Sequence, residues 1–159
     1  MAVYRTHVLV CAGAGCVSSN CKEVEAALQD QLAKVGLSEE VKVIETGCIG
    51  TCDLGPVMVI YPEGVFYQKL TPDDAREIVD EHILKGRVIP RLLFKPANSD
   101  ELVERAADMD FFRRQHRNAL RNTGVIDPEV IEEYIARDGY AALGKALGEM
   151  TREQVIDEI

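Results

Sequence analysis

The sequence lacks the features that would place it in several common functional classes. No apolar run approaches the roughly 18–20 residues that a membrane-spanning helix needs, and a glycine-rich stretch directly follows the apolar residues 8–12. Positive charge is also scarce, since 18 Lys and Arg against 27 Asp and Glu give a net charge of −9. Such a surface repels phosphate groups and anionic lipids, which argues against binding to nucleic acids or membrane surfaces. Without an export signal, we expect a cytoplasmic protein.

Motifs for several kinds of catalysis are missing as well. The sequence has no C-x-x-C pair, which a thiol–disulfide enzyme needs at a helix start. It has no G-x-G-x-x-G loop for binding a nucleotide, and no nucleophilic set built on Ser/His/Asp or Cys/His. A Rieske-type centre is not expected either, because no histidine lies in the cysteine-containing loops; the histidines are His7, His82 and His116.

Cysteine is the residue type that points to a function. There are five, and all lie in the first third of the chain: Cys11, Cys16, Cys21, Cys48 and Cys52. An odd number in a chain without an export signal argues against a disulfide framework. Clustered thiols in a reducing compartment indicate a metal site or redox chemistry instead.

The first part of the chain predicts a small mixed sheet. Apolar runs predict strands over residues 4–10, 41–44, 57–61 and 65–67. One helix is expected to open at Asn20, with Glu23 as its capping partner, and to end at Gly36. A second helix opens at Thr71-Pro72, with a predicted buried face of Ala75, Ile78, Val79 and Ile83. The order β-α-β-β-β-α favours an α/β (α+β) fold with parallel pairing, one hairpin and flanking helices.

The region after about residue 95 differs in kind, because it is helical, charged and free of cysteine. Asp127-Pro128 predicts the start of a helix that ends before Asp138-Gly139, residues 141–147 predict another, and Thr151 predicts a capping box for the last. About 60 residues alone make a marginal core, so we expect this segment to dock onto something larger. The basic and aromatic residues 111–117 are interpreted as a partner-facing patch or a helix face.

The cysteines form the pattern Cys11-x4-Cys16, then 31 residues, then Cys48-x3-Cys52. Because the two parallel strands end at the same edge of the sheet, both loops are expected to meet there. Four thiolates within reach of one centre suit soft acceptors, namely zinc, cuprous ions or an iron–sulfur cluster.

Glycine favours the iron–sulfur alternative over zinc. Gly13 and Gly15 lie between the first two cysteines, while Gly47, Gly50 and Gly55 surround the second pair. Glycine lets backbone N–H groups approach a buried anion, and a 2Fe–2S cluster held by four cysteines is such an anion. Ile49 and Leu54 are expected to shield it from water.

Spacing alone does not rank the three N-terminal thiols, since Cys16-x4-Cys21 repeats the spacing of Cys11-x4-Cys16. Cys21 is expected in the first turn of a helix. There it is better explained as a small apolar packing residue than as a ligand.

Two stretches carry a specific resemblance: V-L-V-C-A-G-A-G-C, and T-G-C-I-G-T-C-D-L-G-P-V-M-V-I-Y-P-E-G-V-F-Y. Residues 1–95 resemble the thioredoxin-like 2Fe–2S ferredoxin domain, in the version fused to the NADH-oxidising flavin subunit of NAD(P)-dependent iron hydrogenases and complex I-type NADH dehydrogenases. The resemblance implies a thioredoxin-like fold, one-electron transfer in the cytoplasm, and cluster ligation by Cys11, Cys16, Cys48 and Cys52, with Cys21 outside the family pattern. The remaining alternative is a structural zinc module that scaffolds a complex.

The helical segment, residues 96–159, is similar to the lead-in of that flavin subunit. In the family this stretch precedes a glycine-rich loop that binds FMN and NADH, and neither that loop nor a 4Fe–4S cysteine set occurs in this sequence. We therefore expect FMN and NAD(H) only in a missing remainder or a partner chain. The expected partners are the flavin/NADH-binding body and iron–sulfur subunits of an oxidoreductase complex, and the chain alone is not expected to be catalytically competent.

Overall fold

The computed structural model describes residues 4–159 and divides into two compact units, one ending at Val125 and the other formed by Ile126–Ile159. The elements of the first unit, in chain order, are β1 (Thr6–Cys11), α1 (Ala14–Ser18), α2 (Cys21–Lys34), β2 (Val41–Thr46), a 3₁₀ turn (Cys52–Leu54), β3 (Met58–Tyr61), β4 (Val65–Tyr67), α3 (Pro72–Glu77), a π-helical turn (Ile78–Ile83), two further 3₁₀ turns (Pro90–Leu92 and Ala106–Asp108) and α4 (Asp110–Arg113). The second unit contains α5 (Ile131–Ile135), α6 (Ala141–Glu149) and α7 (Arg152–Glu158).

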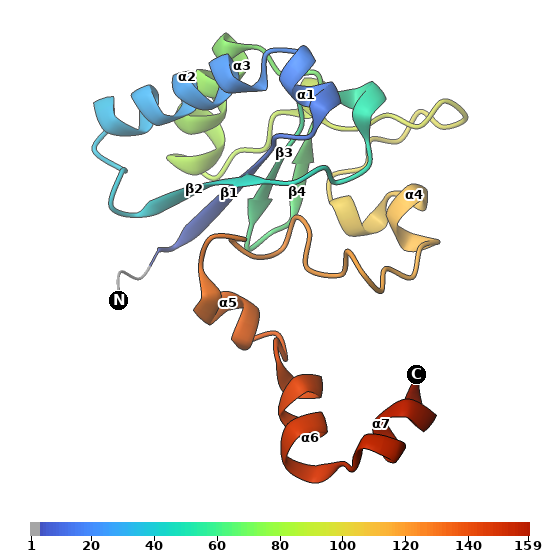
Figure 1. Cartoon of the computed structure of the whole chain (residues 1–159). Coiled ribbons are helices and arrows are strands. Elements are labelled where there is room, and N and C mark those ends of the chain that lie inside the picture. The colour runs from blue at the N-terminus through green and yellow to red at the C-terminus, as the bar shows by residue number, and fades with distance from the viewer. Residues whose placement is uncertain (1–3) are drawn as a thin grey trace. The chain divides into compact units, whose positions relative to one another are not determined.

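A four-stranded mixed sheet organises the first unit (Figure 1). The strand order is β2-β1-β3-β4, with β1 and β2 parallel and the other pairs antiparallel. The parallel register pairs Cys11 with Thr46, so β1 and β2 end side by side. The predicted mixed sheet with a parallel pair and a hairpin is therefore confirmed.

Helices cover one face of this sheet. Figure 1 shows α2 and α3 lying together on it. Alternate strand residues point toward these helices, among them Val8, Val10 and Ile60, and they are buried in a core that includes the predicted face of the second helix: Ala75, Ile78, Val79 and Ile83. Thr71 caps α3 as expected, because it accepts a hydrogen bond from Asp74 N, and the Asp74 side chain completes a capping box that was not predicted.

Residues 106–125 pack against the other face. The ring of Phe112 meets that of Phe66 edge to face, with 6.3 Å between centroids. The Tyr61 hydroxyl donates a hydrogen bond to the Gly124 carbonyl at 3.1 Å. Leu9 and Val59, which alternate with the residues of the helical face, are buried as well. The strands are thus apolar on both faces because both are covered. The predicted domain boundary near residue 95 stays a prediction, while the compact units divide after Val125.

The outer edge of β4 is paired rather than open. Phe66 N donates to Glu104 O at 2.8 Å and Ala106 N donates to Gly64 O at 3.0 Å, while Tyr67 bridges to Leu93. These bonds satisfy backbone groups of an edge strand and tie the chain after α3 to the sheet.

Three local expectations were wrong. Residues 14–18 form the short helix α1 where a loop was expected. Asn20 precedes α2 in a left-handed conformation (φ 65°) and its side chain makes no capping bond, because that backbone geometry points it away from the first turn. The helix expected from Asp127-Pro128 begins only at Ile131, since Asp127 accepts a hydrogen bond from Glu129 N and closes a turn there instead.

The second unit leaves most of its large apolar side chains exposed. Its helices leave Leu143, Leu147 and Ile156 exposed, although Thr151 forms the predicted capping box with Gln154. None of the helices within residues 4–159 is both long and apolar enough to cross a bilayer.

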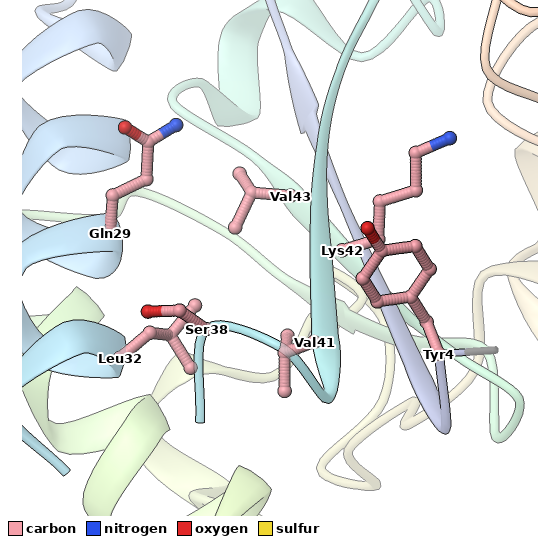
Figure 2. Close-up of a pocket in the computed structure, with 7 residues that line it drawn as sticks. All are labelled: Tyr4, Gln29, Leu32, Ser38, Val41, Lys42 and Val43. Atoms are coloured by element: carbon pink, nitrogen blue, oxygen red, sulfur yellow. The ribbon is translucent and has the colours of Figure 1, made fainter. Parts of the chain in front are cut away.

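A hollow of about 270 Å³ lies between α2 and the edge strand β2. Figure 2 shows Val41 and Val43 facing Gln29 and Leu32 of α2, with Lys42 on the other side of the strand beside the ring of Tyr4. No cysteine lines this hollow, so the chemistry lies elsewhere.

Candidate iron–sulfur site

The parallel strands bring the two cysteine loops to one end of the sheet. Cys11 is the last residue of β1, and Ala12 N donates to Thr46 O, the last residue of β2, at 2.9 Å. Cys11 N also donates to Val57 O at 3.1 Å, which holds the start of the third strand at the same place. Cys48 follows β2 after one glycine, so it lies beside the end of β1.

The other two cysteines lie on short helical turns that approach through glycine. Cys16 is on α1, and Cys52 begins the 3₁₀ turn. A Cβ placed on Gly13 would lie 2.6 Å from Cys48 Cβ, one on Gly15 would lie 3.1 Å from Cys52 Cβ, and one on Gly55 would lie 2.9 Å from Cys16 Sγ. These contacts show that the two loops interlock, and that the glycines are needed because a larger residue would push the cysteines apart.

The sulfurs fall into two pairs. Cys48 Sγ and Cys52 Sγ are 3.6 Å apart, close to the separation of about 3.8 Å for two thiolates on one tetrahedral metal with bonds of about 2.3 Å. Cys11 and Cys16 form the second pair, because the neighbouring Cys11 thiol helps to raise the pKa of Cys16. Among residues 4–159, no three His, Cys, Asp or Glu side chains converge on a single ion position.

The two pairs differ in exposure. Cys11 and Cys16 are buried, whereas Cys48 and Cys52 are exposed. Burial, then the hydrogen bond from Cys11, raises the pKa of the Cys16 thiol to about 12. The neighbouring Cys48 thiol raises the pKa of Cys52. Both effects oppose ionisation of the free thiols, so binding of a metal has to displace their protons.

Polar groups around the sulfurs fit an anionic cluster. The backbone of Val57 forms a hydrogen bond to the Cys16 sulfur that favours its thiolate. Thr51 Oγ1, next to Cys52, is buried and has no hydrogen-bond partner among the described residues. A buried hydroxyl without a partner is costly, and a sulfide or thiolate would satisfy it. The residues present therefore fit a 2Fe–2S group.

Apolar residues limit the access of water. Ile49 is buried and Leu54 is half-buried against the core, as expected for shielding residues. Cys21 lies in the first turn of α2 and is fully buried among apolar residues, as its interpretation as a packing residue requires.

The segment of residues 106–125 also braces the cysteine loop. Arg117 donates to Ile49 O at 3.1 Å, with its guanidinium 4.8 Å from the centre of the Phe112 ring. Gly124 N donates to Thr46 Oγ1 at 3.1 Å. The ring of Phe111 lies against Gly50, so close that a Cβ there would meet it at 3.3 Å. This bracing was not predicted; the only signal was the basic-aromatic run at residues 111–117.

A family model for the thioredoxin-like [2Fe-2S] ferredoxin matches residues 2–82. The chain belongs to this family. It is 47% identical over 77 residues to a 2Fe-2S ferredoxin from Clostridium pasteurianum, a match that covers 48% of this chain and 76% of that protein. The crystal structure of the thioredoxin-like [2Fe-2S] ferredoxin from Aquifex aeolicus is 30% identical, with a TM-score of 0.54, and covers 59% of this chain and 100% of that one.

A further match is to the NADP-reducing hydrogenase subunit HndC of Solidesulfovibrio fructosivorans, 51% identical over 45 residues, which make up 28% of this chain and 9% of that protein. Family membership gives this ferredoxin a 2Fe–2S cluster and a role in electron transfer. The cluster, when bound, accepts and donates one electron at a time.

Proposed function

We propose that Cys11, Cys16, Cys48 and Cys52 hold the cluster, and that this ferredoxin serves as the N-terminal electron-transfer part of an NADH-oxidising subunit of an NADH dehydrogenase or NAD(P)-reducing hydrogenase. The observation that carries the ligand assignment is the interlocking of the two loops at Gly13 and Gly15, which brings the Cys48 and Cys52 side chains against the loop between Cys11 and Cys16.

The difference in exposure between the two cysteine pairs supports a function in electron transfer. Cys11 and Cys16 are anchored in the core, where the protein excludes water, and Cys48 and Cys52 face the surface. Electron transfer requires such an exposed edge close to a partner, and a rigid scaffold that changes little between redox states. The loop bonds of Thr46, Ile49 and Val57 provide that rigidity.

The second unit supports a place in a larger assembly. The helices α5, α6 and α7 have little core of their own and expose Leu143, Leu147 and Ile156. Binding to a partner protein would bury these side chains. Their sequence is similar to the lead-in of the flavin subunit, and the match to HndC points to the same class of complex. On this proposal residues 1–95 form the ferredoxin domain and residues 96–159 the lead-in. FMN and NAD(H) bind elsewhere in the assembly, which works in the cytoplasm.

The ligand set is tested by single Cys→Ser variants of the full chain, purified without oxygen. Wild-type protein is expected to contain about two iron and two sulfide per chain, with the visible and EPR spectra of a 2Fe–2S cluster. Each of the four variants is expected to lose or alter the signal. Cys21→Ser is the matched control and is expected to keep it. Stoichiometric zinc without iron uptake would select the zinc scaffold and reject the proposal.

The place in a complex is tested by purifying a tagged chain from its own cells. Mass spectrometry is expected to find a flavin-binding subunit with it, and NADH is expected to bleach the 2Fe–2S spectrum in that assembly and not in the isolated chain. Purification of the loaded chain alone, or bleaching by NADH without a partner, would contradict this part of the proposal.

A further inference from the structure

The exposed edge of the cysteine loop is bordered by a basic surface on an otherwise acidic protein. Residues 105–121 contain five arginines and two aspartates, a net charge of +3, whereas the whole chain carries −9. Phe111 and four basic residues that follow it in this stretch are called the Phe111 surface, and all but the half-buried Arg117 are exposed: Phe111, Arg113, Arg114, His116 and Arg117.

The Phe111 surface adjoins both exposed cysteines. One hollow of about 310 Å³ is lined by Cys48, Phe111, His116 and Arg117. A second of about 320 Å³ is lined by Cys52, Asp53 and Phe111, so its one charged group is acidic. All of these residues belong to the first compact unit, and Figure 1 shows α4 close to the loop that follows β2. Phe111, His116 and Arg117 therefore border the exposed cysteines.

We infer that the Phe111 surface is the docking site for an electron-transfer protein with an acidic surface around its own redox centre. Positive charge beside the exit attracts such a partner although the whole molecule is acidic, because exposed charges act mainly within a Debye length of about 10 Å. This inference rests on the proposed ligand role of Cys48 and Cys52.

The composition of the surface favours a protein over a small phosphate ligand. An exposed aromatic ring with arginines is typical of the centre of a protein interface. Arg113 and Arg114 both pair with Asp110, at 2.5 and 3.3 Å, and these ion pairs are exposed.

The sign of the local charge can be measured with two cobalt oxidants of opposite charge. Reduced protein loses one electron to tris(oxalato)cobaltate(III), charge −3, or to hexaamminecobalt(III), charge +3, and cobalt(III) becomes cobalt(II). With a net charge of −9 alone, the anionic oxidant would react faster as salt is added. The Phe111 surface predicts the opposite, a several-fold fall in its rate between about 0.01 and 0.3 M salt.

Arg113→Gln combined with Arg114→Gln is expected to reverse the salt dependence for the anionic oxidant. Arg5→Gln with Arg87→Gln is the matched control, because these arginines are also exposed and ion-paired, to Glu40 and Glu81. Arg5 precedes β1, whereas Cys11 ends it, so Arg5 lies at the other end of the sheet, where it donates to the Ile83 carbonyl, four residues before Arg87. The control is expected to keep the wild-type dependence.

A second readout needs no electron transfer. The redox-inert paramagnetic anion hexacyanochromate(III) is expected to broaden the NMR signals of Arg113 and Arg114 side chains and leave those of Arg5 and Arg87 sharp. If the purified chain held no cluster, the proposed function would be refuted. The NMR broadening would still show whether anions bind at the Phe111 surface. A rate that rises with salt, or broadening elsewhere, overturns the inference. Displacement of the anion by micromolar FMN or NADH would assign the surface to a nucleotide and also overturn it.

Discussion

The two compact units treat apolar side chains in opposite ways. In the first, Phe66 and Leu9 on one face of the sheet and Val8 on the other are at most 1% exposed. In the second, Leu147 is 79% and Ile156 is 73% exposed. Both units have helices with good capping boxes, so local helix signals do not separate them. What separates them is burial, which supplies most of the stability of a fold.

This difference indicates what each unit needs from its surroundings. The first has a core on both faces of its sheet and provides the scaffold that the cysteine loops require. The second gains little from its own packing and would gain most from a partner, in line with the proposed lead-in to a flavin-binding body. Substitutions of the same kind in the two units should therefore give different results.

The largest contrast is expected for truncation of apolar side chains. Phe66→Ala removes a fully buried ring that packs against Phe112, and we expect it to lower the free energy of unfolding by about 3–5 kcal/mol. Leu147→Ala should change it by less than about 0.5 kcal/mol in the isolated chain, because that side chain is exposed. Anaerobic denaturant unfolding checks both. A large loss for Leu147→Ala would show that the second unit has a core of its own.

The next contrast uses Gly→Ala in both units. Gly13 has an ordinary extended backbone (φ −62°), so alanine there is opposed only by the new Cβ, 2.6 Å from Cys48 Cβ. We expect a cost of about 1–3 kcal/mol and a reduced iron content. Gly144, on α6, has nothing within 4 Å of such a Cβ, so Gly144→Ala should favour its helix by up to about 1 kcal/mol.

Iron analysis and circular dichroism separate these outcomes. A Gly13→Ala protein with full iron content and unchanged stability would mean that the two cysteine loops are not held together as the structure shows. Loss of iron in Gly144→Ala would likewise link the second unit to the site.

A smaller effect is expected from pH, and only through the first unit. Burial lowers the pKa of His82, whose Nδ1 lies 2.9 Å from the Tyr67 hydroxyl, although Glu63 and Glu104 oppose the shift. The folded state therefore favours neutral His82. Its contribution is fully present above the unfolded pKa of about 6.5 and is lost as the pH falls toward the lower folded value, with a slope of at most about 1.4 kcal/mol per pH unit.

Thermal unfolding between pH 7.5 and 5.5 measures this slope. His82→Gln should flatten it, and His116→Gln, at an exposed position, should not. An equal slope in wild type and His82→Gln would assign the pH dependence to other groups.

Much of the scaffold could be predicted from local pattern. Strand runs, the hairpin, the cap at Thr71 and the capping box at Thr151 depend on neighbouring residues, and the structure bears them out. The meeting of the cysteine loops could also be anticipated, because parallel strands end at one edge. The bracing by Arg117 and Gly124 could not, since bonds to residues 68 and 78 positions away leave no local pattern. Asn20 failed as a cap because its left-handed backbone overrides a favourable side chain.

The smallest contrast compares the two capping boxes. Thr71 accepts from Asp74 N at 3.2 Å, and Thr151 accepts from Gln154 N at 3.3 Å, so the local bonds are nearly the same. Thr71→Ala is expected to lower global stability by about 1 kcal/mol, because α3 unfolds only with the core. Thr151→Ala should leave the free energy of global unfolding unchanged. It should increase the rate of amide hydrogen exchange at the start of α7 about fivefold, because a loss of about 1 kcal/mol then affects only the local opening of that helix. Thr71→Gly is the control for the first, since glycine retains most of the cap preference. If Thr151→Ala lowered global stability as much as Thr71→Ala, the two units would unfold together, and the exposed helices would have to share in the cooperative core.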